Sequence, residues 1–558
     1  MAARAEPGSP PRLPGVGRVA GAAALIAVLT VVARLAGFGR TAVFIWAVGP
    51  THLGDVYTAA NTVPNIIFEI VAGGALASLV VPLLAGAVAV GDRAAVAATT
   101  SALLTWTLTL LVPLAVLVAL AADPIVGLLA KSGTPPEQLA AGARMLRVFA
   151  PQLPLYGVGI VLTGVLQAHH RFAWPVIAPL LSSVTVIGTY LTFAVAQGRR
   201  ADLPTVGPGG QLLLAVGTTL GVVVLSLCLL IPLRRLRLRL RPGYAFPVDA
   251  RRAVGALALA GAVTVGAQQI AVLVTLKLAW GGPTGAVVLF TFAQTVYLLP
   301  WAVLAVPVAT AAYPTMSAAR AVGDEERYRA TVAPATRAIV LLSCLGAAGL
   351  VAIARPAADL LVASHQSAVA AAGIAGFAPG LIGYGLFAVL SRALYARGEP
   401  RPAATATVAG WLTAAVAALA LSGLLAAEHR VLALTLGNSV GMVVLGGLLI
   451  MVVRHRAGPS VLAGLGRAGL AGLLAGAAAT IAGLAVTGWF GAVWHATPTR
   501  GGSLLQGMLS GVVVVLVFLG VAYPLDRHDV RPMTAAVGRR LRGALRRGGR
   551  NGKETGSQ

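Results

Sequence analysis

The chain has 558 residues, of which 58% are hydrophobic and 11% are charged, whereas about a quarter of the residues in soluble proteins are charged. This composition excludes a soluble enzyme, a disordered chain and a single-pass receptor with a large water-exposed domain. The net charge of +25 comes from basic residues that stand between apolar runs. This placement is explained by membrane topology and by contacts with lipid headgroups, and we expect no nucleic-acid partner.

Long apolar runs predict the helices of a multi-pass membrane protein. A bilayer core requires about 20 apolar residues per helix, and the runs are continuous, unlike the alternating strands of a barrel. We therefore predict an all-α polytopic membrane protein with about 14 transmembrane helices. The runs, in chain order, are 19–48, 56–90, 95–122, 141–167, 173–197, 209–233, 253–279, 284–316, 332–354, 368–391, 402–426, 430–453, 466–490 and 503–525.

A short match predicts an internal repeat. Pro82 lies near the end of the second run and Asp92 follows that run. Pro314 and Asp324 are placed in the same way at the eighth, with the same spacing between the two prolines as between the two aspartates. A displacement by six helices keeps the orientation, so the repeat is parallel. We predict two pseudo-symmetric six-helix lobes and two C-terminal helices. The predicted divisions are a leader 1–18, an N-lobe 19–233, a basic linker 234–252, a C-lobe 253–453, a C-terminal helix pair 454–525 and a basic tail 526–558.

The basic residues predict the orientation of the chain. Most of the 42 Lys and Arg residues fall on the side of the two termini when the runs alternate across the membrane. By the positive-inside rule both termini are expected in the cytoplasm. The segment 1–18 has no apolar core of its own, so we interpret it as a cytoplasmic leader, not as a cleaved signal peptide. The cationic face is expected to attract anionic membrane lipids.

Motifs for covalent chemistry are missing from the sequence. It contains neither a phosphate-binding Gly-x-x-x-x-Gly-Lys-Ser/Thr loop, nor His-Glu-x-x-His, nor a Cys/His cluster with metal-ligand spacing. Cys228 and Cys344 lie in apolar runs and are expected to be packing residues. We therefore predict no enzymatic activity, no cofactor and no metal.

The informative residues are the polar ones inside the apolar runs. An ionisable group at membrane depth costs at least about 2.5 kcal/mol and usually faces a cavity or a partner. Five such groups stand in the first, second and seventh runs or, for Asp55, directly before the second: Arg34, Arg40, Asp55, Glu69 and Lys277. Four amides accompany them in the second, seventh and eighth runs: Asn61, Asn65, Gln269 and Gln294. We predict that these side chains line or gate a cavity.

Simpler interpretations remain open for most of these residues. Arg40 and Lys277 are also placed to extend to the membrane interface, and Asp55 to cap the start of its own helix. Arg34 and Glu69 are also able to pair with each other. The amides Asn61, Asn65 and Gln294 also suit hydrogen bonds between packed helices.

Four prolines in the second and eighth runs predict kinked helices: Pro64, Pro82, Pro300 and Pro314. Proline removes a backbone hydrogen bond, and the freed carbonyl is tolerated where it lines a cavity. We expect a cavity between the two lobes, walled by the first, second, seventh and eighth helices. Cations that reach such a cavity suit an anionic headgroup, above all a phosphate or diphosphate.

The first two runs carry a recognisable pattern. The segments 33–40 (ARLAGFGR), 61–65 (NTVPN) and 73–76 (GGAL), with Asp55 and Pro82, resemble the N-terminal signature of the MurJ/MviN lipid II flippases. That family belongs to the MOP superfamily, which includes MATE drug exporters. The similarity extends through the eleventh run, and the residues that carry it there are Arg171, Phe172, Pro175, Pro179, Pro300, Pro314, Gly323, Glu326 and 390–397 (LSRALYAR).

The resemblance implies a fold and a function. It implies two six-helix lobes, a central cationic cavity open alternately to either face, and a groove for a polyprenyl tail on the last two helices. The implied substrate is the undecaprenyl-diphosphate-linked peptidoglycan precursor, lipid II, in the bacterial plasma membrane, with the cell-wall synthesis machinery as a further partner. Arg34, Arg40 and Asp55 occupy positions that are important in the family.

The sequence departs from the family pattern at two places. Phe68 and Glu69 stand where many members carry a pair of arginines, and Thr295 stands where they carry another. The sequence of this region resembles that of the family branch from high-GC Gram-positive bacteria. Lys277 is the candidate that compensates for the missing cations.

Our hypothesis is a lipid II flippase in which Arg34, Arg40 and Lys277 hold the diphosphate. Asp55 and Glu69 would pair with the arginines and be released as the lobes rock. The alternatives are an exporter of another polyprenyl-linked glycan, a MATE-like drug antiporter, and a non-transporting scaffold of the cell-wall machinery.

Overall fold

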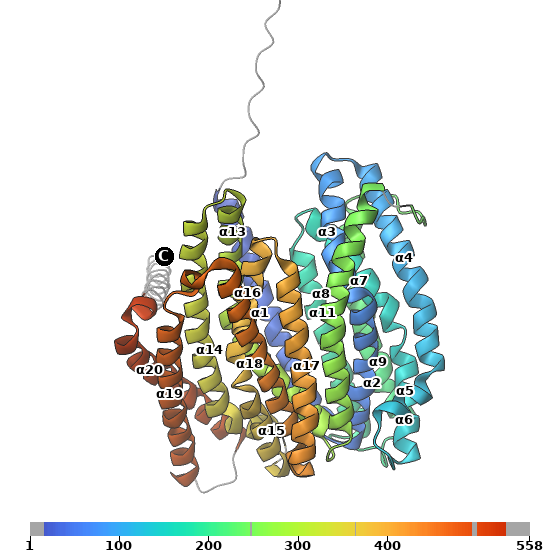
Figure 1. Ribbon diagram of the computed structural model, residues 1–558. Helices are drawn as coiled ribbons and strands as arrows, with labels where there is room; N and C mark the ends of the chain where they lie inside the picture. Colours follow the sequence, from blue (N-terminus) through green and yellow to red (C-terminus); the bar gives the residue numbers. More distant parts are fainter. Residues whose placement is uncertain (1–15, 246–247, 363, 494–498, 532–558) are drawn as a thin grey trace, which may run out of the picture.

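The computed structural model describes residues 16–245, 248–362, 364–493 and 499–531, and every regular element in these ranges is a helix (Figure 1). This confirms the all-α polytopic fold. Nearly all of the expected leader and most of the expected tail lie outside the described residues. The first half of the chain contains α1 (Val16–Ala47), α2 (His52–Phe68), the π-helical turn η1 (Glu69–Gly73), α3 (Gly74–Ala89), α4 (Arg93–Leu120), α5 (Ala122–Leu129), α6 (Pro136–Phe149), α7 (Gln152–Ala168), α8 (Ala173–Gln197), α9 (Pro208–Leu227) and α10 (Leu230–Arg234).

The second half repeats this order and adds two long helices. It contains α11 (Val248–Trp280), α12 (Ala286–Pro300), the π-helical turn η2 (Trp301–Ala305), α13 (Val306–Ala321), α14 (Glu325–Leu361), α15 (Ser364–Phe377), α16 (Gly380–Ala396), α17 (Pro400–Leu424), the 3₁₀ turn η3 (Ala427–His429), α18 (Arg430–Ala457), the 3₁₀ turn η4 (Pro459–Leu462), α19 (Leu465–Val493) and α20 (Arg500–Leu525).

Each of the fourteen predicted apolar runs coincides with one helical region of this order. By length and composition alone, 12 described helices can cross a membrane, or up to 13 if the bent pair His365–Phe377 and Gly380–Ala396 is one span. The remaining predicted run, 56–90, corresponds to α2, η1 and α3, which follow one another without a loop.

The repeat extends to the details of the backbone. Both lobes contain a π-helical turn of the same length, and η2 follows η1 at the same spacing as Pro314 follows Pro82. Asp92 caps α4 by accepting the N–H of Ala95, and Asp324 caps α14 by accepting the N–H of Arg327. These caps satisfy helix N–H groups that have no partner within the helix. The two lobes are therefore built on the same local plan.

The prolines are arranged differently from our expectation. Pro82 and Pro314 are equivalent in the repeat and lie within α3 and α13. Pro300 directly precedes η2, but Phe68 stands at the corresponding place before η1, and Pro64 lies a turn earlier inside α2. Since the π-helical turn forms in both lobes with or without the adjacent proline, the backbone irregularity belongs to the repeat and not to proline alone.

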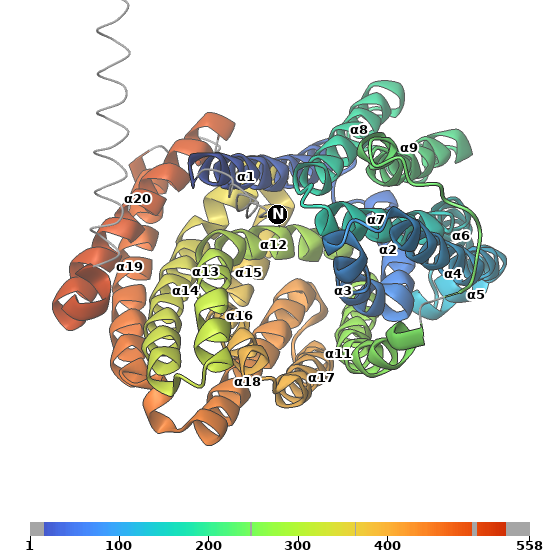
Figure 2. The same cartoon turned by 90° about the horizontal axis from the view of Figure 1, so that it is seen from above.

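The two lobes share one core at one end and have separate cores at the other. We call the end where α1 begins and α20 ends the terminal end, and the end where α2 and α12 begin the closed end (Figures 1 and 2). At the closed end one cluster of buried side chains contains residues of both lobes, such as Val56, Tyr57, Val288 and Phe292. At the terminal end the clusters of the N-lobe and the C-lobe are distinct. The lobes are thus joined at the closed end.

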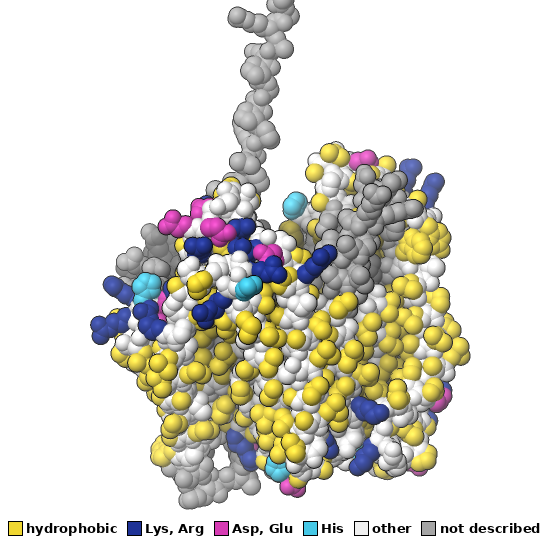
Figure 3. All heavy atoms as spheres, in the orientation of Figure 1, with side chains coloured by type: hydrophobic (Ala, Val, Ile, Leu, Met, Phe, Trp, Pro, Cys, Tyr) yellow, Lys and Arg dark blue, Asp and Glu magenta, His cyan; other side chains and the backbone are white. Residues whose placement is uncertain are grey.

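The α19–α20 pair packs against α14 of the C-lobe. A side chain added at Gly472 would come within 3.0 Å of the Cys344 sulfur, so glycine permits this close approach. Beyond α20, Arg337 donates to Asp529 at 2.6 Å and to the carbonyl of Ala463 at 2.7 Å. Figure 3 shows a hydrophobic belt below a collection of Lys and Arg side chains at the terminal end.

Candidate functional site

Helices α1 and α11 lie between the lobes. α1 packs along α8 of the N-lobe and also contacts α12 and α14 of the C-lobe. α11 packs along α17 of the C-lobe and contacts α2, η1 and α3 of the N-lobe. The second helix, α2, contacts α12 directly. The four helices expected to wall a cavity therefore meet at the interface between the lobes.

Two unpaired arginines lie on α1. The side chains of Arg34 and Arg40 are exposed, and neither makes an ion pair or a hydrogen bond with a described residue. Arg40 is within electrostatic range of Tyr57, Tyr156 and Tyr190. A guanidinium inside an apolar helix is costly without an anionic or polar partner. Both groups are consequently free to meet an anion that enters from outside the described chain.

The other two candidate charges are also unpaired within the described part of the chain. Lys277 is exposed and stands in the last turn of α11, at the closed end. A basic residue there interacts favourably with the helix dipole. This place at the end of the helix is also the one expected if Lys277 extends to the membrane interface. Glu69 opens the π-helical turn η1 and is partly exposed. Among the ion pairs of the described residues, none joins Arg34 to Glu69, so the alternative of such a pair is not realised in this conformation.

The four candidate amides have different surroundings. Gln269 on α11 is buried, and Gln294 on α12 is half-buried. On α2, Asn65 is exposed, whereas the side-chain oxygen of Asn61 is buried without a hydrogen-bond partner among the described residues. A buried carbonyl oxygen without a partner is costly, so Asn61 is the amide whose surroundings most call for a ligand or a rearrangement.

Asp55 has partners that differ from those expected. The sequence predicts that it pairs with an arginine of α1 or caps its own helix, but Thr51 is the residue that caps α2. The buried Asp55 carboxylate instead accepts three backbone N–H groups at the start of α12, from Gly285 at 2.6 Å and from Val287 and Val288 at 3.1 Å. It therefore caps a helix of the opposite lobe and fastens the lobes together at the closed end.

Glycine is required where α12 begins. Gly285 has φ +89°, and a side chain added there would come within 2.7 Å of Pro50 in the N-lobe. Positive φ is costly for other residues, and the contact leaves no room for a side chain. The N–H of Gly285 can reach Asp55 only because the two backbones approach this closely.

Further contacts join the lobes at the same end. His52 lies between Asp202 of the N-lobe at 2.8 Å and Thr284 of the C-lobe at 2.9 Å. Gln366 donates to the carbonyls of Pro50 and Thr284, and the Arg200 guanidinium donates to the carbonyl of Leu361. Sequence reasoning missed this set. One signal was present, because the spacing between His52 and Thr284 is that of the repeat, and equivalent residues meet on a pseudo-two-fold axis.

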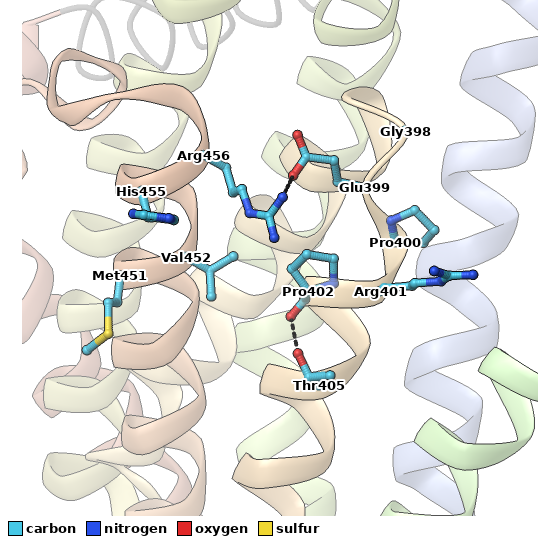
Figure 4. Close-up of a pocket in the computed structure, with 10 residues that line it drawn as sticks. All are labelled: Gly398, Glu399, Pro400, Arg401, Pro402, Thr405, Met451, Val452, His455 and Arg456. Carbon is cyan, nitrogen blue, oxygen red and sulfur yellow. Dashed lines mark hydrogen bonds and ion pairs between the residues drawn. The ribbon is translucent and has the colours of Figure 1, made fainter.

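A separate cavity of about 880 Å³ lies at the terminal end of the C-lobe, between the start of α17 and the end of α18 (Figure 4). Arg456 reaches from α18 toward Glu399, whose carboxylate it approaches at 3.6 Å. Arg397 also pairs with Glu399, at 3.2 Å. The acid in this cavity is thus already neutralised by the chain itself. No group of three or more potential metal ligands occurs among the described residues.

The comparison with known families decides the assignment of the chain. The model of the family described as "Lipid II flippase MurJ" matches residues 46–515. The chain belongs to the lipid II flippase MurJ family. A lipid II flippase MurJ of Burkholderia cenocepacia is 26% identical over 382 residues, which are 66% of this chain and 71% of that protein. A probable MurJ of Synechocystis is 30% identical over 235 residues, 41% of this chain and 43% of that protein, so this alignment spans less than half of the relative's length.

Solved structures show the same fold. A MurJ lipid II flippase in an inward closed conformation superposes with a TM-score of 0.69 and 18% identity, covering 90% of this chain and 99% of that one. An inward-facing MATE-family multidrug transporter of the MOP superfamily gives a TM-score of 0.63 and 16% identity, covering 78% of this chain and 98% of that one. The MurJ architecture expected from the sequence is therefore confirmed as the fold.

Proposed function

We propose that this chain moves lipid II from the inner to the outer leaflet of the bacterial plasma membrane by alternating access, without covalent chemistry. Two guanidinium groups carry the proposal, those of Arg34 and Arg40, which have no partner among the described residues. They lie on the helix between two lobes that are fastened at one end only. Guanidinium groups bind phosphoryl oxygens in bidentate fashion. In this proposal Arg34 and Arg40 hold the diphosphate, and Lys277 contributes from the closed end.

The proposed orientation places the terminal end, with both chain termini, in the cytoplasm. The concentration of Lys and Arg at this end supports the assignment by the positive-inside rule. The closed end then faces outward, and the contacts of Asp55 form the outer gate. Lipid II would enter between the lobes from the cytoplasmic leaflet, and release outward would require those contacts to open.

The proposal is tested in cells whose own lipid II flippase is depleted. We expect the wild-type chain to restore growth, Arg34→Ala to fail at equal protein level, and Arg34→Lys to restore growth in part, because a lysine keeps the charge but not the bidentate geometry. Arg454→Ala is the matched control, because it removes an exposed arginine from the last turn of α18, away from the interface between the lobes. Full growth with Arg34→Ala would remove the diphosphate role from this residue.

The proposed substrate is tested on purified protein in liposomes. Lipid II and an unrelated polyprenyl-diphosphate glycan are placed in the outer leaflet, and their translocation is followed. We expect transport of lipid II. Transport of only the other glycan would favour a related exporter. If neither lipid is translocated, drug resistance of a sensitised host that produces the chain would favour a MATE-like antiporter, and its absence would favour a scaffold of the cell-wall machinery.

A further inference from the structure

The N-lobe holds a second cationic cavity, at the terminal end. Its volume is about 250 Å³, and it lies where the α3–α4 turn, the α7–α8 turn and the segment after α10 meet. The polar side chains that line it are Asp92, Arg93, His169, Arg171 and Arg235. Three arginines therefore converge on one small cavity.

No described carboxylate neutralises these arginines. Asp92, the one acid in the lining, uses its carboxylate to cap α4 by accepting the N–H of Ala95 at 2.9 Å. Arg171 donates to the carbonyl of Pro232 at 3.2 Å. In the described part of the chain, neither Arg93, Arg171 nor Arg235 makes an ion pair with a carboxylate. The lining thus carries an excess of positive charge.

The pseudo-equivalent corner of the C-lobe carries an acid that the N-lobe corner lacks. The turn after α7 has His170 at φ 56°, followed by Arg171, whose N–H bonds to the carbonyl of Leu166. The turn after α16 has Gly398 at φ 72°, followed by Glu399, whose N–H bonds to the carbonyl of Leu394. Both turns therefore have the same backbone hydrogen bond and a residue in the left-handed conformation at the same place. Arg171 stands where the C-lobe carries an acid, Glu399.

The same exchange of charge occurs at the start of α4 and α14. In the repeat, Arg93 at the start of α4 corresponds to Glu325 at the start of α14. Glu325 pairs with Arg320 and Arg397, and Glu399 pairs with Arg397 and Arg456. The C-lobe therefore contains its own anions at two positions where the N-lobe has arginines.

A difference in volume accompanies the difference in charge. Tyr328 is fully buried in α14, donates its hydroxyl to the carbonyl of Ala393 at 3.0 Å and has the Arg397 guanidinium over its ring. The corresponding residue in α4 is the smaller Val96, which lines the N-lobe cavity. At the position of Val96 the N-lobe thus leaves space that Tyr328 occupies in the C-lobe, and its arginines lack the two carboxylates that the C-lobe places beside its own.

We propose that this cavity binds a phosphoryl group, as a phosphate ion or as the headgroup of an anionic phospholipid. The ligand would supply the negative charge that Glu325 and Glu399 supply in the C-lobe. Arginine is suited to this role because its N–H groups match two phosphoryl oxygens. Since Arg235 stands at the start of the linker between the lobes, the bound anion would also tie the linker to α4 and to the α7–α8 turn. The site is independent of the proposed flippase function.

The experiment uses the full chain. Binding of inorganic phosphate is measured by calorimetry in detergent, and retention of phosphatidylglycerol against phosphatidylcholine by native mass spectrometry after nanodisc release. Arg93→Glu and Arg171→Glu copy the C-lobe acids and should weaken binding at least tenfold, since they provide an internal anion. Arg239→Glu makes the same charge change on an exposed linker arginine outside the cavity and should change binding less than twofold.

The two measurements separate the sources of the phosphoryl group. Arginine-dependent binding of inorganic phosphate supports a soluble ligand, and arginine-dependent retention of phosphatidylglycerol alone supports a lipid. Equal effects of Arg239→Glu and Arg171→Glu, or no effect of either, would overturn the site, because binding would then follow net charge or not involve the cavity. If a glutamate variant is not monodisperse, Arg93→Gln at the exposed end of α4 replaces it, with the same expected loss of binding.

Discussion

Replacing Asp55 with asparagine tests whether one carboxylate fastens the lobes together. In Asp55→Asn the side-chain oxygen can still accept from two of the three N–H groups of α12, but an amide NH₂ replaces the oxygen that accepts from Gly285 at 2.6 Å. Two donors then face each other. The change therefore removes one charge-assisted hydrogen bond and reduces two others to neutral ones.

The size of the effect follows from these bonds. A hydrogen bond to a charged group contributes about 1.5–3 kcal/mol, and a neutral one contributes about 1 kcal/mol. Losing one and weakening two costs the closed arrangement about 3 kcal/mol, which corresponds to roughly a hundredfold change in the ratio of closed to open protein. The start of α12 also loses the negative charge that stabilises its N-terminus.

The assay is a distance between spin labels on the two lobes at the closed end. Labels at Ser132 and Glu428, which are exposed, are introduced after the two cysteines of the chain, Cys228 and Cys344, are replaced by serine. We expect Asp55→Asn to enlarge the population with a long distance. Asp359→Asn is the control, because Asp359 lies at the same end but pairs with Arg355 of its own helix. An unchanged distance distribution in Asp55→Asn, or an equal shift in the control, would refute the role of Asp55 as the fastening.

Three other predictions concern particular residues. Gly285→Ala should lengthen the same label distance, because it places a methyl group against Pro50 at positive φ. Gly133→Ala should leave the distance unchanged, because Gly133 has φ +86° but no neighbour within 4 Å. Equal shifts in both variants would assign the effect to backbone strain alone. Gly472→Leu should lower the melting temperature by separating α19 from α14, whereas Gly469→Leu, which meets nothing within 4 Å, should leave it unchanged; equal melting temperatures would contradict the packing. Burial raises the pKa of Asp529, but the hydrogen bonds from Arg337 and His528 and the positive charge of Arg337 together outweigh burial and hold the pKa below its usual value. Its contribution to stability is consequently present above about pH 4 and lost as the pH falls through the lowered pKa. In that pH range the melting temperature of the wild type should therefore fall more steeply than that of Asp529→Asn. Parallel curves of melting temperature against pH would exclude the contribution.

The helices could be predicted because the bilayer imposes one requirement on all of them. The predicted run 173–197 coincides with α8 (Ala173–Gln197), since its ends are set by the change from apolar to polar sequence. The run 332–354 is shorter than α14 (Glu325–Leu361). The first two turns of α14 carry Glu325, Glu326 and Arg327, which lie before the apolar stretch. Hydropathy detects the lipid-facing part of a helix and not the helix that continues into water.

The contacts of the candidate site were less predictable than its residues. Asp55 was singled out because a carboxylate at membrane depth needs a partner, but its partners are backbone N–H groups of α12. Every residue except proline carries such a donor, so no side chain in the sequence marks it. The unpaired state of Arg34 and Arg40 was equally hidden, because an isolated charge is expected to find an acid, and Glu69 offered one.

The repeat explains why the gate and the second cavity each depend on broken symmetry. At the closed end, equivalent helix starts meet, as the contact of His52 with Thr284 illustrates, and two helix N-termini that face each other repel. One carboxylate, Asp55, stands between them, whereas the equivalent position is occupied by Val287, because a second acid would repel the first. At the terminal end the equivalent corners are far apart, so each must balance its own charge. The C-lobe does so with Glu325 and Glu399. At these places the N-lobe carries arginines without a carboxylate partner among the described residues, and the proposed phosphoryl ligand would balance their charge.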